Sequence, residues 1–402
     1  MSGTELTLEA LFAAGSMGNI PDPYPLYRRL RDTSPVVTIP SSIGELDDGS
    51  APAFAMITRY DDVRAALKND AVFSSTVVNR LMGGLLGPTI IGMDGREHLK
   101  HRALVTPSLA PRALRGDFPA LVERIAHEQI DRFAGRGTAD LRAEFTFNYP
   151  LRVLVEILGL PAGDADRFHS LSVELTHATT DLAAGLAAAQ QMGECLMPLI
   201  ERKRSEGGDD LIAGLARAEV DGERLSDLEV VSFLRLLVSA GAETTYHLLG
   251  SCLVALLRDP ELCERVRSDR SLVVPFLHEI LRWEAPVAML MRETAEDVEV
   301  GGVVVTKGTY VSCNIASANR DERRFPDPDR VDIDRADKEH VSFGFGKHYC
   351  AGSRLALLEA EVGLNALLDR LPGLSAQPGE DFAVIGVTFR GPDRLPVRFD
   401  PT

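Results

Sequence analysis

The sequence predicts a mainly α-helical protein that carries small β-sheets. Its longest regular pattern, at residues 226–257, is that of a capped and almost continuously apolar helix. Most other periodic segments also follow the helical repeat, whereas the strand-like segments are only a few residues long. No linker rich in proline, glycine or serine divides the chain, so we expect residues 1–402 to form a single domain.

Composition excludes several classes of protein. Hydrophobic residues make up 45% and charged residues 25%, as in an ordinary globular protein. The net charge of -16 argues against binding to nucleic acid or to anionic membranes. We find neither a membrane-length apolar window nor a signal peptide at residues 1–20, so no membrane anchor is expected. The five cysteines are odd in number and lack paired spacing, which favours the reducing cytoplasm.

The first part of the chain alternates short helices and strands. We predict helices at residues 22–31 and 61–69, and strands at 36–39 and 54–58 with a loop at 41–53 between them. Residues 74–93 remain apolar but lose their period and contain glycines and a proline, which predicts a long loop. A loop of this length and apolarity is usually functional or disordered, and an ordinary packed surface loop is the alternative.

Helical patterns then continue up to the central helix. They lie at residues 97–105, 118–133 and 151–158, and the alanine-rich region 165–201 predicts two helices joined near 179–185, which form a lid. Ser226 and Glu229 match a capping box at the start of the central helix, which the sequence Asp259-Pro260 ends. That helix should be about 45 Å long at the standard rise per residue.

The middle of the central helix has the sequence AGAETT at residues 240–245. A buried carboxylate at Glu243 is unfavourable without partners. Gly241 is also unfavourable, by about 1 kcal/mol relative to alanine, in a helix interior. Two unfavourable residues in one turn indicate a functional site, and a kink stabilised by threonine hydroxyls is the alternative.

After the central helix the chain combines one helical motif with several short strands. Glu279 and Arg282 lie three residues apart on one helical face, and an apolar stretch at 286–291 leads to Arg292. A hairpin is predicted at 298–305, and strands at 310–315, 383–389 and 395–399.

A glycine-rich run, FGFGKHYCAG at residues 343–352, precedes another helical pattern. Cys350 therefore lies at a helix N-terminus, where backbone N–H groups and the helix dipole favour a thiolate. Gly346 and Gly352 allow a sharp turn and the close approach of a flat group, against which Phe343 can pack, and His348 can donate to an anion. This arrangement suits an axial ligand of haem iron. A buried structural cysteine is the alternative.

This run resembles the cysteine-ligand loop of the cytochromes P-450, of the soluble bacterial type. Phe343, Gly346, Cys350 and Gly352 occupy the fixed positions of that pattern, and the other motifs occur in family order over nearly the whole chain. The resemblance implies the cytochrome P-450 fold, with haem b (iron protoporphyrin IX) between the long central helix and the cysteine loop. It makes Cys350 the metal ligand.

The resemblance also implies roles for other residues. Thr244 would interact with bound dioxygen, and Glu243 would belong to the path of the protons. Glu279, Arg282 and Arg335 would be structural residues that support the cysteine loop. The cofactor-binding residues would be His98, Arg102, Ala240, Gly241, Arg292, Phe343, Gly346, His348, Cys350 and Gly352. The candidate substrate pocket comprises Leu81, Met82, Leu85, Ile90, Val287, Met289, Leu290 and Ile385, and Val384 and Val387 are further candidates.

The family implies a haem-thiolate monooxygenase that uses O2 to hydroxylate or epoxidise a lipophilic molecule of terpenoid, steroid, fatty acyl or polyketide type. Electrons would come from NAD(P)H through a ferredoxin and its reductase, since no flavin, nicotinamide or iron–sulfur motif is found. A basic island formed by Arg96, Lys100, Arg102, Arg112 and Arg115 is a candidate docking face for an acidic redox partner. A monomer is expected. The alternatives are a peroxygenase or an oxygen-independent rearranging enzyme on the same fold, or a non-catalytic haem sensor.

Overall fold

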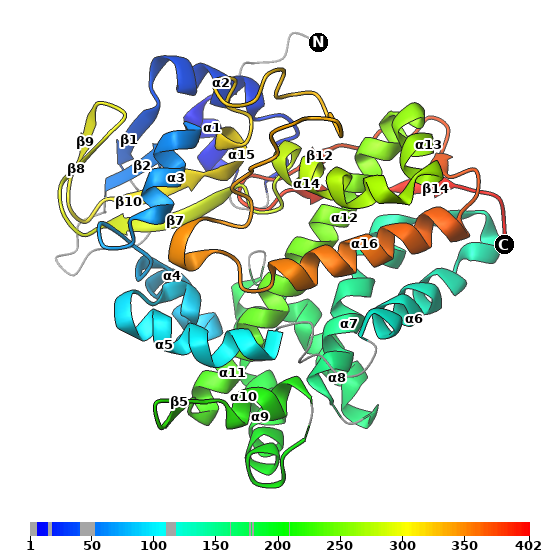
Figure 1. The fold of residues 1–402 in the computed structure, drawn as a ribbon, viewed down its shortest axis with the longest axis horizontal. Coiled ribbons are helices and arrows are strands. Elements are labelled where there is room, and N and C mark those ends of the chain that lie inside the picture. The colour runs from blue at the N-terminus through cyan, green and yellow to red at the C-terminus, as the bar shows by residue number, and fades with distance from the viewer. Residues whose placement is uncertain are drawn as a thin grey trace.

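The computed structural model describes residues 6–14, 18–40, 53–109, 118–160, 162–176, 178, 181–208 and 210–402. It confirms a mainly helical fold with small sheets. Figure 1 shows the N-terminal helices and the largest sheet gathered at one side, while helices occupy the rest of the molecule. The long helix α12 passes through the middle, and α16 crosses it.

The largest sheet has five strands in the order β1-β2-β10-β7-β3. Only the β2–β10 pair is parallel. The strands are β1 (Val36–Pro40), β2 (Ala53–Ile57), β3 (Phe73–Ser74), β7 (Met289–Thr294) and β10 (Tyr310–Asn314). Around it lie α1 (Leu8–Ala13), α2 (Tyr24–Thr33), α3 (Tyr60–Lys68), α15 (Ile315–Ala318) and the hairpin of β8 (Val298–Val300) with β9 (Val303–Val305). The predicted loop at 41–53 lies outside the described residues except for Ala53.

Residues 74–93 are not the long loop that the sequence predicted. They form helix α4 (Val77–Leu86) and a 3-10 turn (Ile90–Gly92). Gly83 and Gly84 sit in the last turns of α4, and the helix stops at Gly87, whose φ is 80°. Gly87 therefore ends this helix, and the paired glycines inside it concealed a helical repeat in which the apolar side chains share one side, opposite Asn79 and Arg80.

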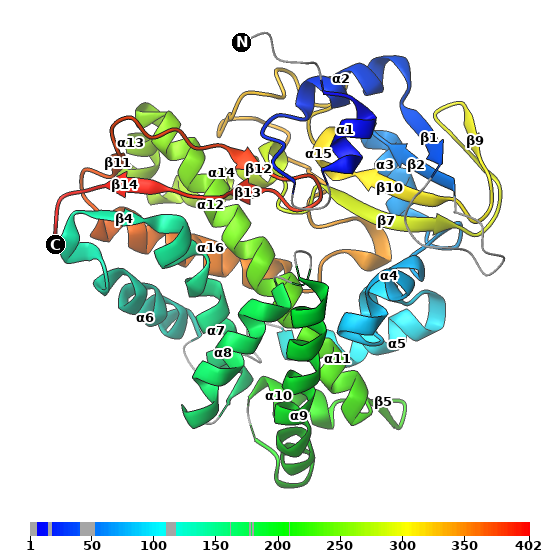
Figure 2. The ribbon, with the colours of Figure 1, turned by 180° about the vertical axis from the view of Figure 1, so that it is seen from behind.

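The helices of the middle region lie close to their predicted positions. They are α5 (Gly95–Val105), α6 (Phe118–Asp131), α7 (Asn148–Leu158), α8 (Ala162–Thr176), α9 (Leu182–Glu206) and α10 (Leu211–Arg217). Two helices, α8 and α9, do occupy the alanine-rich region, and they project from one end of the molecule (Figure 2). Gly185, predicted at their joint, lies inside α9 because that helix begins three residues earlier.

The central helix begins at the predicted capping box of Ser226 and Glu229. It is not continuous, since α11 (Asp227–Leu237) passes through a π-helical turn (Val238–Ala242) into α12 (Glu243–Arg258). At this turn the hydroxyl of Thr244 donates to the carbonyl of Ala240 at 2.7 Å, and that of Thr245 to Gly241 at 2.9 Å. Extra hydroxyl donors of this kind stabilise an irregular helical turn.

The C-terminal part frames the central helix. It contains α13 (Pro260–Ser268), α14 (Val273–Trp283) and α16 (Ser353–Arg370). The predicted strand at 383–389 is only β12 (Val384–Ile385), paired with β13 (Gly391–Pro392), because Gly386 at φ 116° turns the chain. The last strand, β14 (Pro396–Arg398), lies between β4 (Thr138–Asp140) and β11 (Ser375–Ala376), and β5 (Glu219–Val220) pairs with β6 (Glu223–Arg224). Among the described residues, no helix is both long and apolar enough to cross a lipid bilayer.

Candidate active site

The cysteine loop runs from Phe343 through a 3-10 turn (Gly346–His348) to the start of α16. Gly344 and Gly346 have φ values of 72° and 74°, a region that favours glycine. A Cβ on Gly346 would lie 3.0 Å from the carbonyl oxygen of Leu67, so α3 packs directly on the loop. The N–H of Cys350 donates to the carbonyl of Phe343 at 2.8 Å and closes the loop.

One expectation about this loop is wrong. Gly352 has a φ of -90° and is not needed for the turn, although a Cβ there would meet nothing within 4 Å. Burial in apolar surroundings raises the pKa of the Cys350 thiol, although the N–H groups of Gly352 and Ser353 and the guanidinium of Arg102 oppose this rise. The N–H groups at the helix N-terminus therefore favour the thiolate, as predicted, but burial outweighs them, and a bound metal ion deprotonates a coordinating thiol.

A cavity of about 270 Å³ lies between the cysteine loop and the central helix. Cys350 stands on one wall, and Thr244 on the other. The remaining predicted residues that line it are His98, Arg102, Ala240, Gly241, Phe343, His348 and Gly352, with Ile90, Val287 and Leu290 of the predicted substrate pocket. Segments more than 100 residues apart in the sequence thus meet around one space.

One end of the cavity carries imidazole and guanidinium groups. His98 is 0% exposed, and neither of its ring nitrogens has a hydrogen-bond partner among the described residues. The rings of His98 and His348 lie 3.9 Å apart between centroids, and Nε2 of His348 is 3.5 Å from the carboxylate of Asp94. Arg102 donates to the carbonyl of Tyr349 at 2.6 Å.

Burial, together with His348 and Arg102, lowers the pKa of His98 to about 4, so its ring is neutral and can donate one hydrogen bond. Arg292 is 6% exposed and donates to the carbonyl of its neighbour Met291 at 2.7 Å. The unpartnered nitrogens of His98 and the guanidinium of Arg102 can both donate to an anionic group at this end of the cavity, whereas Arg292 and Gly346, also predicted to bind the cofactor, are not among the described residues that line it. The two carboxylates of a haem are such anionic groups, so the residues present fit the cofactor.

Glu243 and Thr244 point in different directions. The Thr244 hydroxyl lines the cavity, whereas Glu243 is not among the described residues that line it. The Glu243 carboxylate is buried and faces Nε2 of His247 at 3.9 Å, one turn along α12. Burial lowers the pKa of His247, and neither of its ring nitrogens has a hydrogen-bond partner within the described part of the chain.

Glu279, Arg282 and Arg335 do meet. Glu279 and Arg282 are fully buried on α14 and pair at 2.8 Å, and Nε of Arg335 reaches the same Glu279 oxygen at 3.3 Å. Arg282 also donates to three carbonyls in the segment before the cysteine loop, those of Asn319, Pro328 and Arg330. The cluster therefore joins α14 to the chain that leads to Cys350.

Five predicted pocket residues are not among the described residues that line the cavity: Leu81, Met82, Leu85, Met289 and Ile385. Met289 alternates with Leu290 on β7 and faces the opposite side of the sheet. Leu81 is largely exposed, since α4 presents it to solvent. Val384 and Val387 are buried elsewhere. Lining residues outside the predicted set include Ile91, Leu109, Leu154, Phe233, Leu236, Leu237, Thr245 and Leu248, of which those on the central helix follow its period from Ala240 and Thr244.

Together, the fold and the site define a haem-binding protein with a cysteine ligand. The family model "Cytochrome P450" matches residues 187–381. Cytochrome P450 107B1 of Saccharopolyspora erythraea is 38% identical over 360 residues, which are 85% of this chain and 88% of that protein. Vitamin D(3) 25-hydroxylase of Pseudonocardia autotrophica is 36% identical over 390 residues, 94% of each chain.

Solved structures agree with these relatives. The structure of cytochrome P450 CYP109Q5 from Chondromyces apiculatus has a TM-score of 0.85 at 34% identity and covers 98% of this chain and 97% of that chain. CYP109E1 from Bacillus megaterium in complex with testosterone has a TM-score of 0.84 at 29% identity and covers 94% and 99%. The chain belongs to the cytochrome P450 family. It is a haem-thiolate monooxygenase that oxidises small lipophilic molecules with O2.

Proposed function

We propose that Cys350 is the iron ligand, that His98, Arg102, Arg292 and His348 hold the haem carboxylates, and that Thr244 and Glu243 deliver protons. When bound, haem with a thiolate ligand activates dioxygen for insertion into an organic molecule. The observation that carries the assignment is the single cavity with Cys350 on one wall and the Thr244 hydroxyl on the other. Phe343, Gly346, Gly352, Ala240 and Gly241 would contact the faces of the cofactor.

The protein residues can supply protons in an ordered way. The Thr244 hydroxyl donates its hydrogen to the Ala240 carbonyl. Its oxygen can still accept a hydrogen bond, so it can hold a proton donor at that wall of the cavity. Glu243 lies one residue earlier, buried beside His247, and would move protons toward Thr244 by rotating its side chain. Because these two side chains would carry the protons, the otherwise apolar cavity would not need to admit bulk water.

We infer that the substrate is a terpenoid, steroid, fatty acyl or polyketide compound. Away from the cationic end, the described wall is mainly apolar, with isoleucine, leucine and phenylalanine as its large side chains and Glu359 as its one acidic residue. Relatives include a mycinamicin IV hydroxylase/epoxidase and a vitamin D(3) 25-hydroxylase, and one structural neighbour was solved with testosterone. These names support a bulky lipophilic substrate.

Bacterial members of the family use redox partners, and we propose a ferredoxin with its reductase. Leu99 is 51% exposed and Tyr349 44%, so apolar surface flanks the cysteine loop. Of the basic island, Lys100 pairs with Glu223, Arg102 donates to Tyr349, and Arg112 and Arg115 lie outside the described residues.

Five unpaired cysteines favour the cytoplasm. We also propose a monomer with one domain spanning residues 1–402.

Replacing Thr244 tests the proton-delivery role. A substrate would first be found by a spin-state screen of steroids, terpenes and macrolides. With ferredoxin, reductase and NAD(P)H, Thr244→Ala should form at least about tenfold less product per NAD(P)H and release hydrogen peroxide instead. Turnover driven by added hydrogen peroxide should persist, because peroxide brings its own protons.

Ser239→Ala is the matched control, since Ser239 makes the same kind of bond to a helix carbonyl away from the cavity. Wild-type coupling in Thr244→Ala would reject the assignment. Activity with peroxide but none with ferredoxin and reductase would instead identify the peroxygenase alternative.

A further inference from the structure

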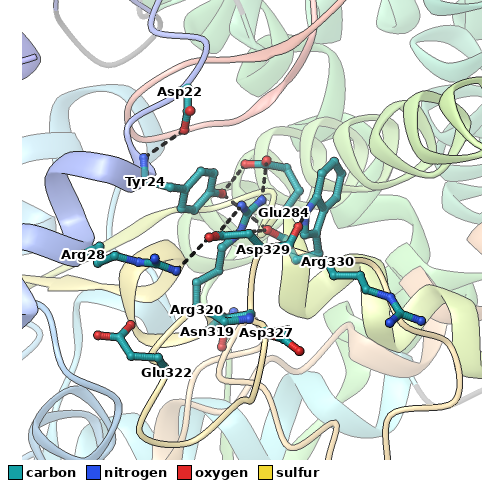
Figure 3. Close-up of polar contacts among 12 residues, drawn as sticks. Asp22, Tyr24, Arg28, Glu284, Asn319, Arg320, Glu322, Asp327, Asp329 and Arg330 are labelled. Carbon is teal, nitrogen blue, oxygen red and sulfur yellow. Dashed lines mark hydrogen bonds and ion pairs between the residues drawn. The ribbon is translucent and has the colours of Figure 1, made fainter. Parts of the chain in front are cut away.

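A buried ion cluster lies just beyond the end of α14, away from the haem-binding residues. Its centre is the Glu284 carboxylate, which accepts the Tyr24 hydroxyl at 2.5 Å (Figure 3). Arg390 donates to the same carboxylate oxygen, and Arg320 reaches the other oxygen at 3.3 Å. The Arg320 guanidinium also stacks on the Tyr24 ring, 3.4 Å from its centroid. Each of these four residues is at least nine-tenths buried.

The cluster joins four parts of the chain, of which one is the segment after α15 that carries Arg320. Tyr24 begins α2, Glu284 follows α14, and Arg390 belongs to the C-terminal loop that precedes β13. The Arg390 guanidinium further donates to the carbonyls of Ile20 and Pro21 at the N-terminus and to that of Gly386 in its own loop. At the outer side, Asp329 pairs with Arg320 at 3.2 Å and with Arg28 at 3.0 Å.

The segment between Glu284 and β7 carries part of the cavity wall. Pro286 and Val287 line the cavity. Both are fixed to the C-terminal loop, because the Arg390 N–H donates to the Pro286 carbonyl at 3.0 Å and the Ala288 N–H donates to the Thr388 carbonyl at 2.7 Å. Val287 therefore forms an isolated β-bridge with Phe389. The position of this wall depends on where Glu284 and Arg390 hold the two segments.

We propose that Tyr24, Glu284, Arg320 and Arg390 are positioning residues that set the place of the Pro286–Val287 wall and so determine which bulky ligands the cavity accepts. None of these four described residues lines the cavity itself. They act through the backbone bonds at 286–288. The inference rests on the proposed function, in which this cavity is the substrate site. A rigid supporting shell is needed because a wall displaced by a fraction of an ångström changes ligand affinity.

Two iron-coordinating probes separate wall position from haem binding. Imidazole is small and reports on the iron alone, whereas clotrimazole is bulky and presses on the cavity wall. In the holoprotein, Tyr24→Phe removes one hydroxyl and should raise the clotrimazole dissociation constant, read from the Soret shift, by about threefold to tenfold. The imidazole constant should stay within about twofold of wild type. Arg390→Lys, which keeps the charge but loses the planar fork, should act in the same direction.

Tyr60→Phe is the matched control. Tyr60 is similarly buried, and its hydroxyl donates to the Glu339 carbonyl at 2.7 Å and not to the Glu284 carboxylate. It should leave both constants unchanged even where it lowers thermal stability. Unchanged clotrimazole binding in Tyr24→Phe and Arg390→Lys would overturn the inference and leave the cluster a stabilising element only. The absence of any imidazole shift in the wild type would instead reject the haem site and with it the proposed function.

Discussion

His340 and His278 show how burial and neighbouring groups change the pKa of single residues near the cysteine loop. Nδ1 of His278 on α14 lies 3.2 Å from Nε2 of His340, whose ring stands 5.8 Å from that of Phe343 between centroids. The Ser342 N–H donates to the other His340 nitrogen at 3.3 Å. Burial, together with the nearby His278 and Arg282, lowers the pKa of His340 to about 3. Its ring is therefore neutral at physiological pH.

This pKa predicts a pH dependence of stability. The unfolded chain binds a proton on this histidine near its ordinary pKa of about 6.5, whereas the folded protein does so only near 3. The stabilisation is thus complete above about pH 6.5 and is lost as the pH falls toward 3. Between pH 7 and 5, the wild type should lose about 1–2 kcal/mol more unfolding free energy than His340→Gln, as measured by urea titration.

A second histidine substitution serves as the control for this test. His278 carries its own lowered pKa, caused by burial and by Lys338, and it contributes to both curves. His127, whose Nδ1 faces Arg370 near the surface, provides the comparison variant His127→Gln, which should follow the wild-type curve. Parallel curves for His340→Gln and the wild type would show that the His340 ring takes up its proton equally in both states.

At the scale of elements, the contact of α12 with β13 depends on two glycines. A Cβ placed on Gly391 would lie 1.9 Å from Nδ1 of His247, and one on Gly250 would lie 2.7 Å from the Pro392 ring. The fully buried imidazole of His247 thus occupies the space that a side chain on β13 would need. This contact also holds His247 beside Glu243, on the side of α12 away from the cavity.

Gly391→Ala should therefore destabilise the protein by about 1–3 kcal/mol, because the strand or the imidazole must shift. Adding His247→Ala to Gly391→Ala should recover part of this loss. The double variant should therefore lose less unfolding free energy than the two single variants lose together. Urea unfolding of the four proteins measures this coupling. Gly135→Ala is the control, since a Cβ there meets nothing within 4 Å. Strict additivity would mean that the two residues do not compete for space.

Elements with strong local signals could be predicted from the sequence. The capping box at Ser226, the glycine-bent loop before Cys350 and the helix after it are each determined within a few residues. Helix α4 could not be found in this way, because Gly83 and Gly84 are poor helix formers and interrupt a repeat that is only ten residues long. The irregular turn at 238–242 agrees with the alternative of a kink stabilised by threonine hydroxyls, but its π-helical form was not predicted. It depends on which carbonyls the Thr244 and Thr245 hydroxyls engage, which is settled only by packing.

In the candidate site, too, residues in local motifs could be predicted, whereas residues placed by tertiary packing could not. Residues fixed by a local motif, such as Cys350 and Thr244, line the cavity as expected. Apolar residues chosen for their neighbourhood in sequence often do not, because adjacent strand residues such as Met289 and Leu290 point to opposite faces. The unpartnered nitrogens of His98 and the position of Glu243 outside the cavity became visible only in three dimensions.

Across the whole molecule, buried arginines connect parts of the chain that share no secondary structure. Arg390 ties the C-terminal loop to the N-terminus, and Arg31 ties α2 to Glu322 and to the Ser317 carbonyl. Arg282 links α14 to the irregular segment before the cysteine loop. Irregular segments lack their own ladders of hydrogen bonds, so their carbonyls need donors from elsewhere. A planar guanidinium with five N–H donors can satisfy several of them at once.

Arg282→Lys tests this connection, because it preserves the charge and removes the fork. A lysine can neither hold Glu279 through two parallel bonds nor reach the carbonyls of Asn319, Pro328 and Arg330 together. Leaving these groups unsatisfied should destabilise the protein by about 3–5 kcal/mol. The purified variant should also bind less haem, since the segment before Cys350 loses its support. Unfolding curves and the haem content per chain measure both effects.

Arg265→Lys is the matched control for this substitution. Arg265 is exposed and pairs with the exposed Asp334 at 3.1 Å, so its replacement should change stability by less than about 1 kcal/mol. The two arginines differ in burial and in the carbonyls they satisfy, and both belong to an ion pair. A loss in Arg282→Lys no greater than that in Arg265→Lys would mean that charge alone, without the geometry of the guanidinium, holds the cysteine segment against α14. If Arg282→Lys lost haem but kept its stability, the substitution would act on the cysteine loop and not on the packing of α14.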